Sequence, residues 1–149
     1  MKALFFAALL GLSACARPDY IDPKQVVQED NNTHSASCPV LFLTSNQCAS
    51  IEWVQGPRSS SESEFIVKFW NKGLASMQGP YTDPVQSLSI VLWMPSMGHG
   101  SSPVKIEKLQ DGVFRVRKVF FIMPGDWEIR FIYKNQNLIV DQDAIALVI

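Results

Sequence analysis

The sequence predicts an all-β domain, a sandwich of about seven or eight short antiparallel strands. No window of the chain shows convincing helical periodicity. Runs of apolar, β-branched and aromatic residues recur instead at intervals of about ten residues, and turn residues separate them. Hydrophobic residues make up 47% of the chain, which is enough to fill a core between two sheets.

The expected strands follow one another from residue 39 to the end of the chain. Most end at Gly, Pro or Asn, and the Asp-Gly pair at 111–112 is a strong hairpin signal. Residues 88–93 are apolar enough to suggest a strand buried on both faces. The expected runs are Pro39–Leu43, Ala49–Val54, Glu64–Trp70, Leu88–Trp93, Val104–Leu109, Val113–Met123, Trp127–Lys134 and a last apolar run that ends at Ile149.

Alternation within two of these runs predicts which side chains face the core. Between residues 113 and 120 strict alternation places Val113 and Val119 on one face and Val116 on the other. Between residues 127 and 134 the expected inner side chains alternate with Glu128, Arg130, Ile132 and Lys134. The side chains expected inside are therefore Trp127, Ile129, Phe131 and Tyr133.

The N-terminal residues have the pattern of an export signal. Residues 1–14 join a positive start to an apolar segment that is too short for a transmembrane helix. The run Leu12-Ser13-Ala14-Cys15 resembles the lipobox of bacterial lipoproteins, which implies that Cys15 carries a lipid and becomes the mature N-terminus. Ala16 resembles the residue found in lipoproteins of the Gram-negative outer membrane, facing the periplasm. The alternative is an ordinary secretory signal with a chance Cys.

Residues 15–37 separate this signal from the expected domain at 38–149. They are polar, contain two Pro and lack a sustained period, as is typical of a tether. His34 lies in this segment, where a lone His more often has no metal role than serves as a ligand. The net charge of −1 and the lack of a basic run exclude nucleic acid as an expected partner. We expect contact with a membrane only through the N-terminal lipid.

Two further cysteines, Cys38 and Cys48, remain once Cys15 is assigned to the lipid. An even pair in an exported protein is expected to form a disulfide, which would stabilise a short loop by roughly 2–3 kcal/mol. The competing interpretation makes both thiolates metal ligands. Their separation matches no common metal spacing, so the disulfide is the preferred prediction.

The stretch from residue 93 to residue 103 carries the strongest functional signal. It leaves a strand at a Pro and forms a loop that contains Met94, Met97 and His99 within six positions. Met123 also stands directly before a Pro at the end of an expected strand. Thioether and imidazole ligands gathered in this way suit Cu(I) better than a hard cation.

Two interpretations of these side chains stay open. In the first, Met94, Met97, His99 and Met123 bind Cu(I), and the indole of Trp93 adds a cation–π contact to the bound metal. In the second, the methionines fill the end of the core and the imidazole hydrogen-bonds to the backbone of a turn. The second interpretation suits Met97 less well, because a loop residue after a Pro lies beyond the core.

The two methionine motifs resemble the YtkA-like domain in order and spacing. The motifs are Met94-Pro95-x-Met97-Gly98-His99, then an Asp-Gly hairpin, then Phe121-x-Met123-Pro124-Gly125-x-Trp127, and the resemblance covers roughly residues 64–149. It implies an immunoglobulin-like sandwich of exported or membrane-anchored type. Related domains accompany cytochrome oxidase and copper-handling proteins in bacteria. The resemblance highlights the same four side chains and does not extend to His34 or to the first third of the chain.

Signals for an enzyme are weak. A nucleophile elbow, a zinc-binding His-Glu-x-x-His and a phosphate loop are all missing from the sequence. Alternation places Asp126 and Glu128 on the solvent face, so His99 has no obvious orienting carboxylate. The sequence therefore predicts a non-enzymatic, lipid-anchored periplasmic protein that binds copper for delivery, sequestration or sensing, with a copper-handling envelope protein as partner. The alternative is an interaction module of an envelope complex without metal.

Overall fold

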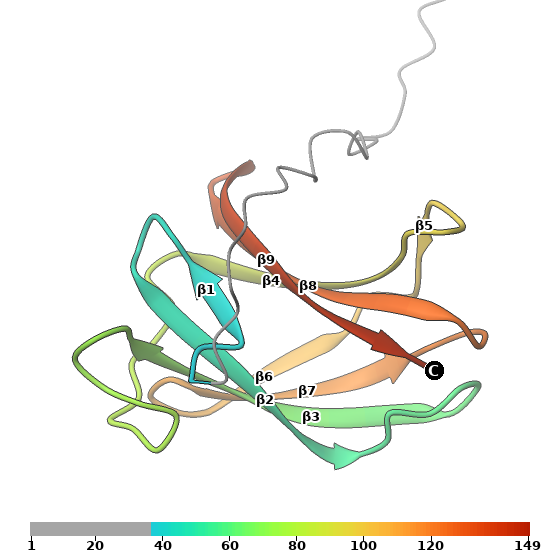
Figure 1. Ribbon diagram of the computed structural model, residues 1–149, viewed down its shortest axis with the longest axis horizontal. Helices are drawn as coiled ribbons and strands as arrows, with labels where there is room; N and C mark the ends of the chain where they lie inside the picture. The colour runs from blue at the N-terminus through green and yellow to red at the C-terminus, as the bar shows by residue number, and fades with distance from the viewer. Residues whose placement is uncertain (1–36) are drawn as a thin grey trace, which may run out of the picture. The chain divides into compact units, whose positions relative to one another are not determined.

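The computed structural model describes residues 37–149, and this part of the chain forms nine β-strands (Figure 1). The expected signal 1–14, the lipidation site Cys15, His34 and the tether up to residue 36 lie outside the described residues. No helix long and apolar enough to cross a membrane occurs between residues 37 and 149. The strands are β1 (Val40–Phe42), β2 (Gln47–Gln55), β3 (Glu62–Asn71), β4 (Ser87–Met94), β5 (His99–Gly100), β6 (Lys105–Gln110), β7 (Val113–Phe120), β8 (Asp126–Asn135) and β9 (Leu138–Val148).

The strands form two antiparallel sheets that pack face to face. One sheet has the order β1-β2-β3-β7-β6 and the other has the order β5-β4-β8-β9. Figure 1 shows the second sheet lying across the first, with the loops gathered at the two ends. The predicted all-β sandwich is confirmed. The strand beyond the expected eight is β5, two residues of the Met/His loop that pair with the end of β4.

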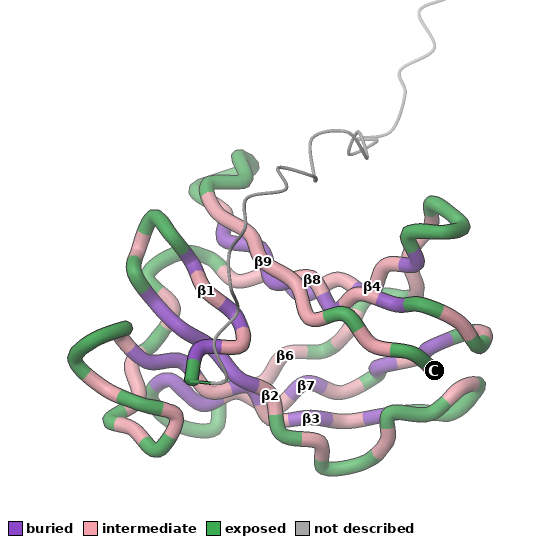
Figure 2. The backbone as a smooth tube through the Cα atoms, in the orientation of Figure 1, coloured by how far each residue is buried: buried purple, intermediate pink, exposed green. Residues whose placement is uncertain are grey.

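The core lies between the two sheets, and β8 supplies much of it. Trp127, Ile129, Phe131 and Tyr133 are all at most 1% exposed, as alternation predicts, but Ile132 is also buried, at 3%. Figure 2 shows buried segments on strands of both sheets. The ring of Tyr133 stacks on Phe42 of the opposite sheet with 3.7 Å between centroids. This strand therefore links both sheets through aromatic contacts.

β4 is buried on one face only, so the expectation of two buried faces is wrong. Ile90, Leu92 and Met94 are at most 5% exposed, whereas the side chains between them are half-buried. The outer face of this sheet has no second layer among the described residues. Side chains of the neighbouring strand cover it in part, as Arg130 does over Trp93.

β7 contains a bulge that changes which side chains face inward. Lys118 has φ of 58°, and the register with β3 shifts by one residue between Val116 and Val119. The amide of Lys118 donates to Oε1 of Glu62 at 2.9 Å, which holds the bulge. Val116 and Val119 are consequently both buried, although strict alternation places them on opposite faces.

The predicted disulfide between Cys38 and Cys48 is confirmed, with 5.2 Å between the two Cα atoms. It packs against the buried indole of Trp70 in a small cluster separate from the main core. The bridge fixes β1 to the start of β2, so this three-residue strand does not depend on its own pairing alone.

Two carboxylates of β9 hold the other side of β1. The amide of Leu41 donates to Asp143 at 2.6 Å, and the amide and hydroxyl of Thr44 both donate to Oδ2 of Asp141. These bonds join an edge of one sheet to an edge of the other. They satisfy backbone donors that would otherwise face solvent beside the sheet edge.

Candidate metal site

The Met/His loop is a tight turn between β4 and β5. Pro95 cannot donate to the ladder, and the carbonyl of Met94 accepts hydrogen bonds from the amides of Met97 and Gly98 at 3.2 and 3.0 Å. Gly98 has φ of 66°, a left-handed conformation that glycine adopts without strain. This turn returns the chain so that His99 pairs directly with Met94.

His99 is half-buried and lies on the same face as Met94, since directly opposite residues of an antiparallel pair share a face. The Cβ atoms of such a pair are about 4.5–5.5 Å apart. Nδ1 of His99 lies 3.2 Å from the carbonyl oxygen of Gly100 and donates to it when this nitrogen carries the proton. Nε2 makes no hydrogen bond with any of residues 37–149. This is the arrangement in which an imidazole ligates a metal through Nε2.

Met94 connects this turn to the second methionine motif. Its side chain is 2% exposed, and its Cε lies 2.9 Å from the position that a Cβ on Gly125 would take. The 123–125 turn therefore lies against the end of β4. Met94 ends β4, whereas Met123 lies in the turn between β7 and β8, three residues after β7 ends at Phe120.

Met123 is half-buried and packs against the main core. Its carbonyl accepts a 2.9 Å hydrogen bond from Nε1 of Trp127, and the Trp127 indole meets the ring of Phe121 edge to face at 5.5 Å. The backbone of Gly125 is in turn bonded to Ile149 in both directions at 3.0 Å. These contacts hold the turn rigidly beside the Met/His loop.

Met97 differs from the other methionines because its side chain is 59% exposed. The four predicted donors therefore share one end of the sandwich but lie at different depths, with Met94 innermost and Met97 outermost. Among the described residues, no group of three or more His, Cys, Asp or Glu side chains is placed to hold a metal ion. The donors present at this end are chiefly thioethers, which match a soft ion.

Trp93 lies on the face opposite to Met94, since successive side chains of a strand alternate. The cation that contacts its ring is the guanidinium of Arg130, 4.8 Å from the ring centroid. Arg130 is held by Glu128 at 2.7 Å, and Glu128 is the residue that pairs with Trp93 across the sheet. Sequence reasoning missed Arg130, although its place two residues after Glu128 on the same face was a usable signal.

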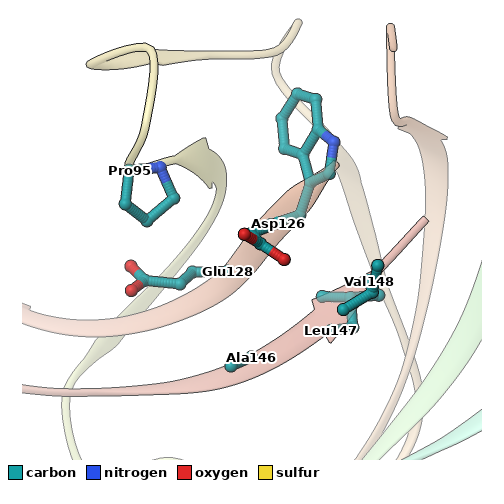
Figure 3. Close-up of a pocket in the computed structure, with 7 residues that line it drawn as sticks. Pro95, Asp126, Glu128, Ala146, Leu147 and Val148 are labelled. Carbon is teal, nitrogen blue, oxygen red and sulfur yellow. The ribbon is translucent and has the colours of Figure 1, made fainter. Parts of the chain in front are cut away.

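A shallow pocket of about 270 Å³ lies beside the loop on the outer face of the sheet (Figure 3). Pro95 and the carboxylates of Asp126 and Glu128 border it, and an apolar part of β9 forms its floor. Both carboxylates lie on the outer face, as predicted, whereas His99 shares the inner face with Met94. Neither carboxylate is therefore placed to orient the imidazole.

Comparison with family models finds a match to part of the chain. The model of the YtkA-like family matches residues 80–131, a narrower range than the motifs alone implied. All four predicted donors lie inside the match, whereas β1, β2, β3 and β9 lie outside it. No curated protein and no solved structure matches the chain. The match to residues 80–131 and the two-sheet fold together fit a YtkA-like domain of immunoglobulin-like type.

Proposed function

We propose that the domain binds copper as Cu(I) at the end of the sandwich formed by the β4–β5 turn and the 123–125 turn. Its role would be to deliver, sequester or sense copper rather than to catalyse a reaction. The observation that carries the proposal is the pairing of Met94 with His99 while Met94 also contacts Gly125. Through these contacts two methionine motifs that are distant in the sequence share one small region.

The donor set fits Cu(I) in its chemistry. Thioethers and a neutral imidazole are soft or borderline ligands, and Cu(I) accepts low coordination numbers. The bond between His99 and the Gly100 carbonyl would fix the tautomer with Nε2 free for the metal. Met97 is the exposed donor, His99 and Met123 are half-buried, and Met94 is buried. We therefore assign the first contact with copper to Met97.

A competition titration with a Cu(I) chelator under anaerobic conditions tests the proposal. We expect the wild-type chain to take up about one equivalent of Cu(I), because the four donors can complete only one coordination sphere. The double variant Met97→Leu/His99→Ala should lose this uptake. The matched control Met77→Leu/His34→Ala removes the same two side-chain types elsewhere in the chain and should leave uptake unchanged.

Two results would contradict copper binding. One is a wild-type chain that does not compete with the chelator at any ratio. The other is a control variant that loses as much uptake as the Met97→Leu/His99→Ala variant, since that would point to scattered surface sites. Thermal unfolding of all three chains shows whether a loss of uptake reflects a loss of fold.

We further propose that a lipid on Cys15 holds the domain at a bacterial membrane, with the outer membrane facing the periplasm as the expected location. The lipobox-like run before Cys15 supports this proposal. Metabolic labelling with a tagged fatty acid tests it. Wild-type protein should be labelled and recovered with membranes, and Cys15→Ser should abolish both. Labelling that persists in Cys15→Ser would show that the lipid, if any, is attached elsewhere.

The free edge of β4 favours a second candidate function, a protein-interaction module without metal. β5 pairs only with Trp93 and Met94, so within residues 37–149 no strand covers the edge from Ser87 to Val91. An apolar groove of about 360 Å³ lies between this edge and β6. An extended segment of a partner could add to the edge and place alternate side chains in the groove.

Site-specific photocrosslinking separates the two candidates. A crosslinker at Ser89 should capture one defined envelope protein if the edge is an interface, and the capture should persist in Met97→Leu/His99→Ala. A crosslinker at Val148, which is 77% exposed on β9 at the opposite edge of the same sheet, serves as the control. Equal capture at both positions would count against an interface at β4.

A further inference from the structure

We propose that Met97 is a reversible oxidation site and that its conversion to the sulfoxide releases copper from the domain. The copper part of this inference rests on the proposed function, whereas the oxidation part rests on the structure alone. The oxidant would be a hydroperoxide. The structural basis is the different exposure of methionines that lie close together at one end of the fold.

Exposure selects Met97 over its neighbours. Its side chain is 59% exposed, whereas Met94, three residues earlier, is 2% exposed. Met123 and Met77 are both half-buried, the first against the main core and the second against the disulfide cluster. Because the sulfur must be reached by the peroxide oxygen, we expect Met97 to react first.

The fold would tolerate an added oxygen at Met97 but not at Met94. The Met97 side chain extends from a turn into open surroundings, and a Cβ on the adjacent Gly98 would meet no atom within 4 Å. A sulfoxide there remains solvated. The side chain of Met94 is enclosed, with its Cε against Gly125, so a sulfoxide at Met94 would bury a polar group without a partner. Oxidation of Met97 therefore changes the chemistry of the loop while the sandwich stays folded.

The chemical step is a two-electron oxygen transfer. A lone pair of the thioether sulfur attacks the distal peroxide oxygen, the O–O bond breaks, and the proton of the attacked oxygen passes to the departing oxygen, which leaves the sulfur bonded to oxygen. With hydrogen peroxide the other product is water. Methionine sulfoxide reductases return the thioether at the expense of a dithiol, so the change is reversible.

The consequence for copper follows from ligand softness. The sulfoxide presents a hard oxygen and has lost the exposed soft donor, and Cu(I) favours sulfur. Removing groups that support a metal site typically lowers affinity about 10–100-fold, and loss of a direct ligand should reach at least this range. A domain with oxidised Met97 would thus give up copper under the conditions in which free Cu(I) reacts with peroxide.

Peptide mapping by mass spectrometry tests the first part of the inference. The full chain is treated with a limiting amount of hydrogen peroxide, the reaction is stopped with catalase, and oxygen incorporation is measured at each methionine. We expect Met97 to be oxidised about tenfold faster than Met94. Met97→Leu serves as the variant without the target and Met77→Leu as the matched control. Equal rates at Met97 and Met94 would overturn the inference.

A Cu(I) titration of the oxidised chain tests the second part. Wild-type and Met77→Leu chains should lose affinity after oxidation, and a reductase should restore it. Met97→Leu should have the lower affinity from the start and should not change with peroxide. If untreated wild-type protein binds Cu(I) and the Met97 sulfoxide form binds it equally well, the regulatory role is wrong while the proposed function stands. If untreated protein binds no Cu(I), the proposed function and the regulatory role both fail, whatever the oxidation map shows.

Discussion

The hydroxyl of Tyr133 donates a 2.7 Å hydrogen bond to Oε1 of Gln47, and both side chains are fully buried. Gln47 starts β2 of one sheet and Tyr133 lies in β8 of the other, so the bond crosses the core. The amide group of Gln47 also accepts from the amide of Val85 at 3.3 Å and donates to the carbonyl of Asp83 at 3.0 Å. One side chain thereby ties both sheets to the connection between β3 and β4.

We predict that Tyr133→Phe destabilises the domain by about 1–2 kcal/mol, because the buried Oε1 of Gln47 loses one of its two donors. Gln47→Leu should cost more, since it also leaves the amide of Val85 and the hydroxyl of Tyr133 without partners. The free energies of unfolding come from urea titration. The double variant should be less destabilised than the sum of the singles, and strict additivity would show that the two side chains are not coupled.

The same tyrosine should make the fold sensitive to alkaline pH. Burial, and then the charge of Asp141, raises the pKa of Tyr133 well above its usual value near 10. The contribution of the neutral Tyr133 side chain to stability is therefore fully present below about pH 10. It is lost as the pH rises further, because the Tyr133 hydroxyl ionises more readily in the unfolded chain than in the folded one. Stability measured at several pH values above 9 should fall more steeply in wild type than in Tyr133→Phe. Parallel curves would contradict the assignment.

Gly125 and Gly98 form a matched pair that tests the contribution of Met94 to copper binding. Both have positive φ, 137° and 66°, so Ala is strained at each position. Only a Cβ at Gly125 meets Met94, at 2.9 Å from its Cε, whereas a Cβ at Gly98 meets nothing within 4 Å. We expect Gly125→Ala to displace the thioether and lower Cu(I) affinity about tenfold, and Gly98→Ala, which adds backbone strain without touching Met94, to lower it less. Equal affinities, measured by chelator competition, would remove Met94 from the ligand set.

Gly112 and Gly73 provide a second pair, for the hairpin between β6 and β7. Their φ values are 65° and 81°. A Cβ at Gly112 would lie 2.4 Å from the amide nitrogen of Thr82, whereas one at Gly73 would meet no atom within 4 Å. Backbone atoms cannot move aside as a flexible side chain can. Gly112→Ala should therefore cost more than about 3 kcal/mol and Gly73→Ala about 1 kcal/mol, as measured by urea unfolding. Similar costs would show that the contact with Thr82 relaxes.

Features that depend on local pattern could be predicted from the sequence. The alternation of aromatic and charged side chains in β8 predicts its buried face, and the Asp-Gly pair predicts the β6–β7 hairpin. The cysteine count predicts the disulfide of Cys38 with Cys48. The first two predictions depend only on residues that are neighbours in the chain. The third depends only on the tendency of paired cysteines to oxidise in an exported protein.

Features that depend on tertiary register could not be predicted. The bulge at Lys118 changes the phase of β7 because of a bond to Glu62, which is distant in the sequence. The bond of Gln47 to Tyr133 joins positions 86 apart. At the candidate site, the sequence placed the methionines at strand ends but could not give their depths. The burial of each methionine depends on how the 123–125 turn packs against Met94. That packing is set by the register of β4 with β8.

The candidate metal site and the hydrogen bond between Tyr133 and Gln47 lie near opposite ends of β8, and this has a thermodynamic consequence. Tyr133 is six positions after Trp127, which lies beside the methionine turn, and strand geometry makes this distance about 20 Å. Free-energy effects of substitutions this far apart, without shared partners, are expected to sum independently. Substitutions of the exposed donors in the β4–β5 turn can therefore change the ligand that is bound without reducing the stability that the Tyr133–Gln47 bond contributes.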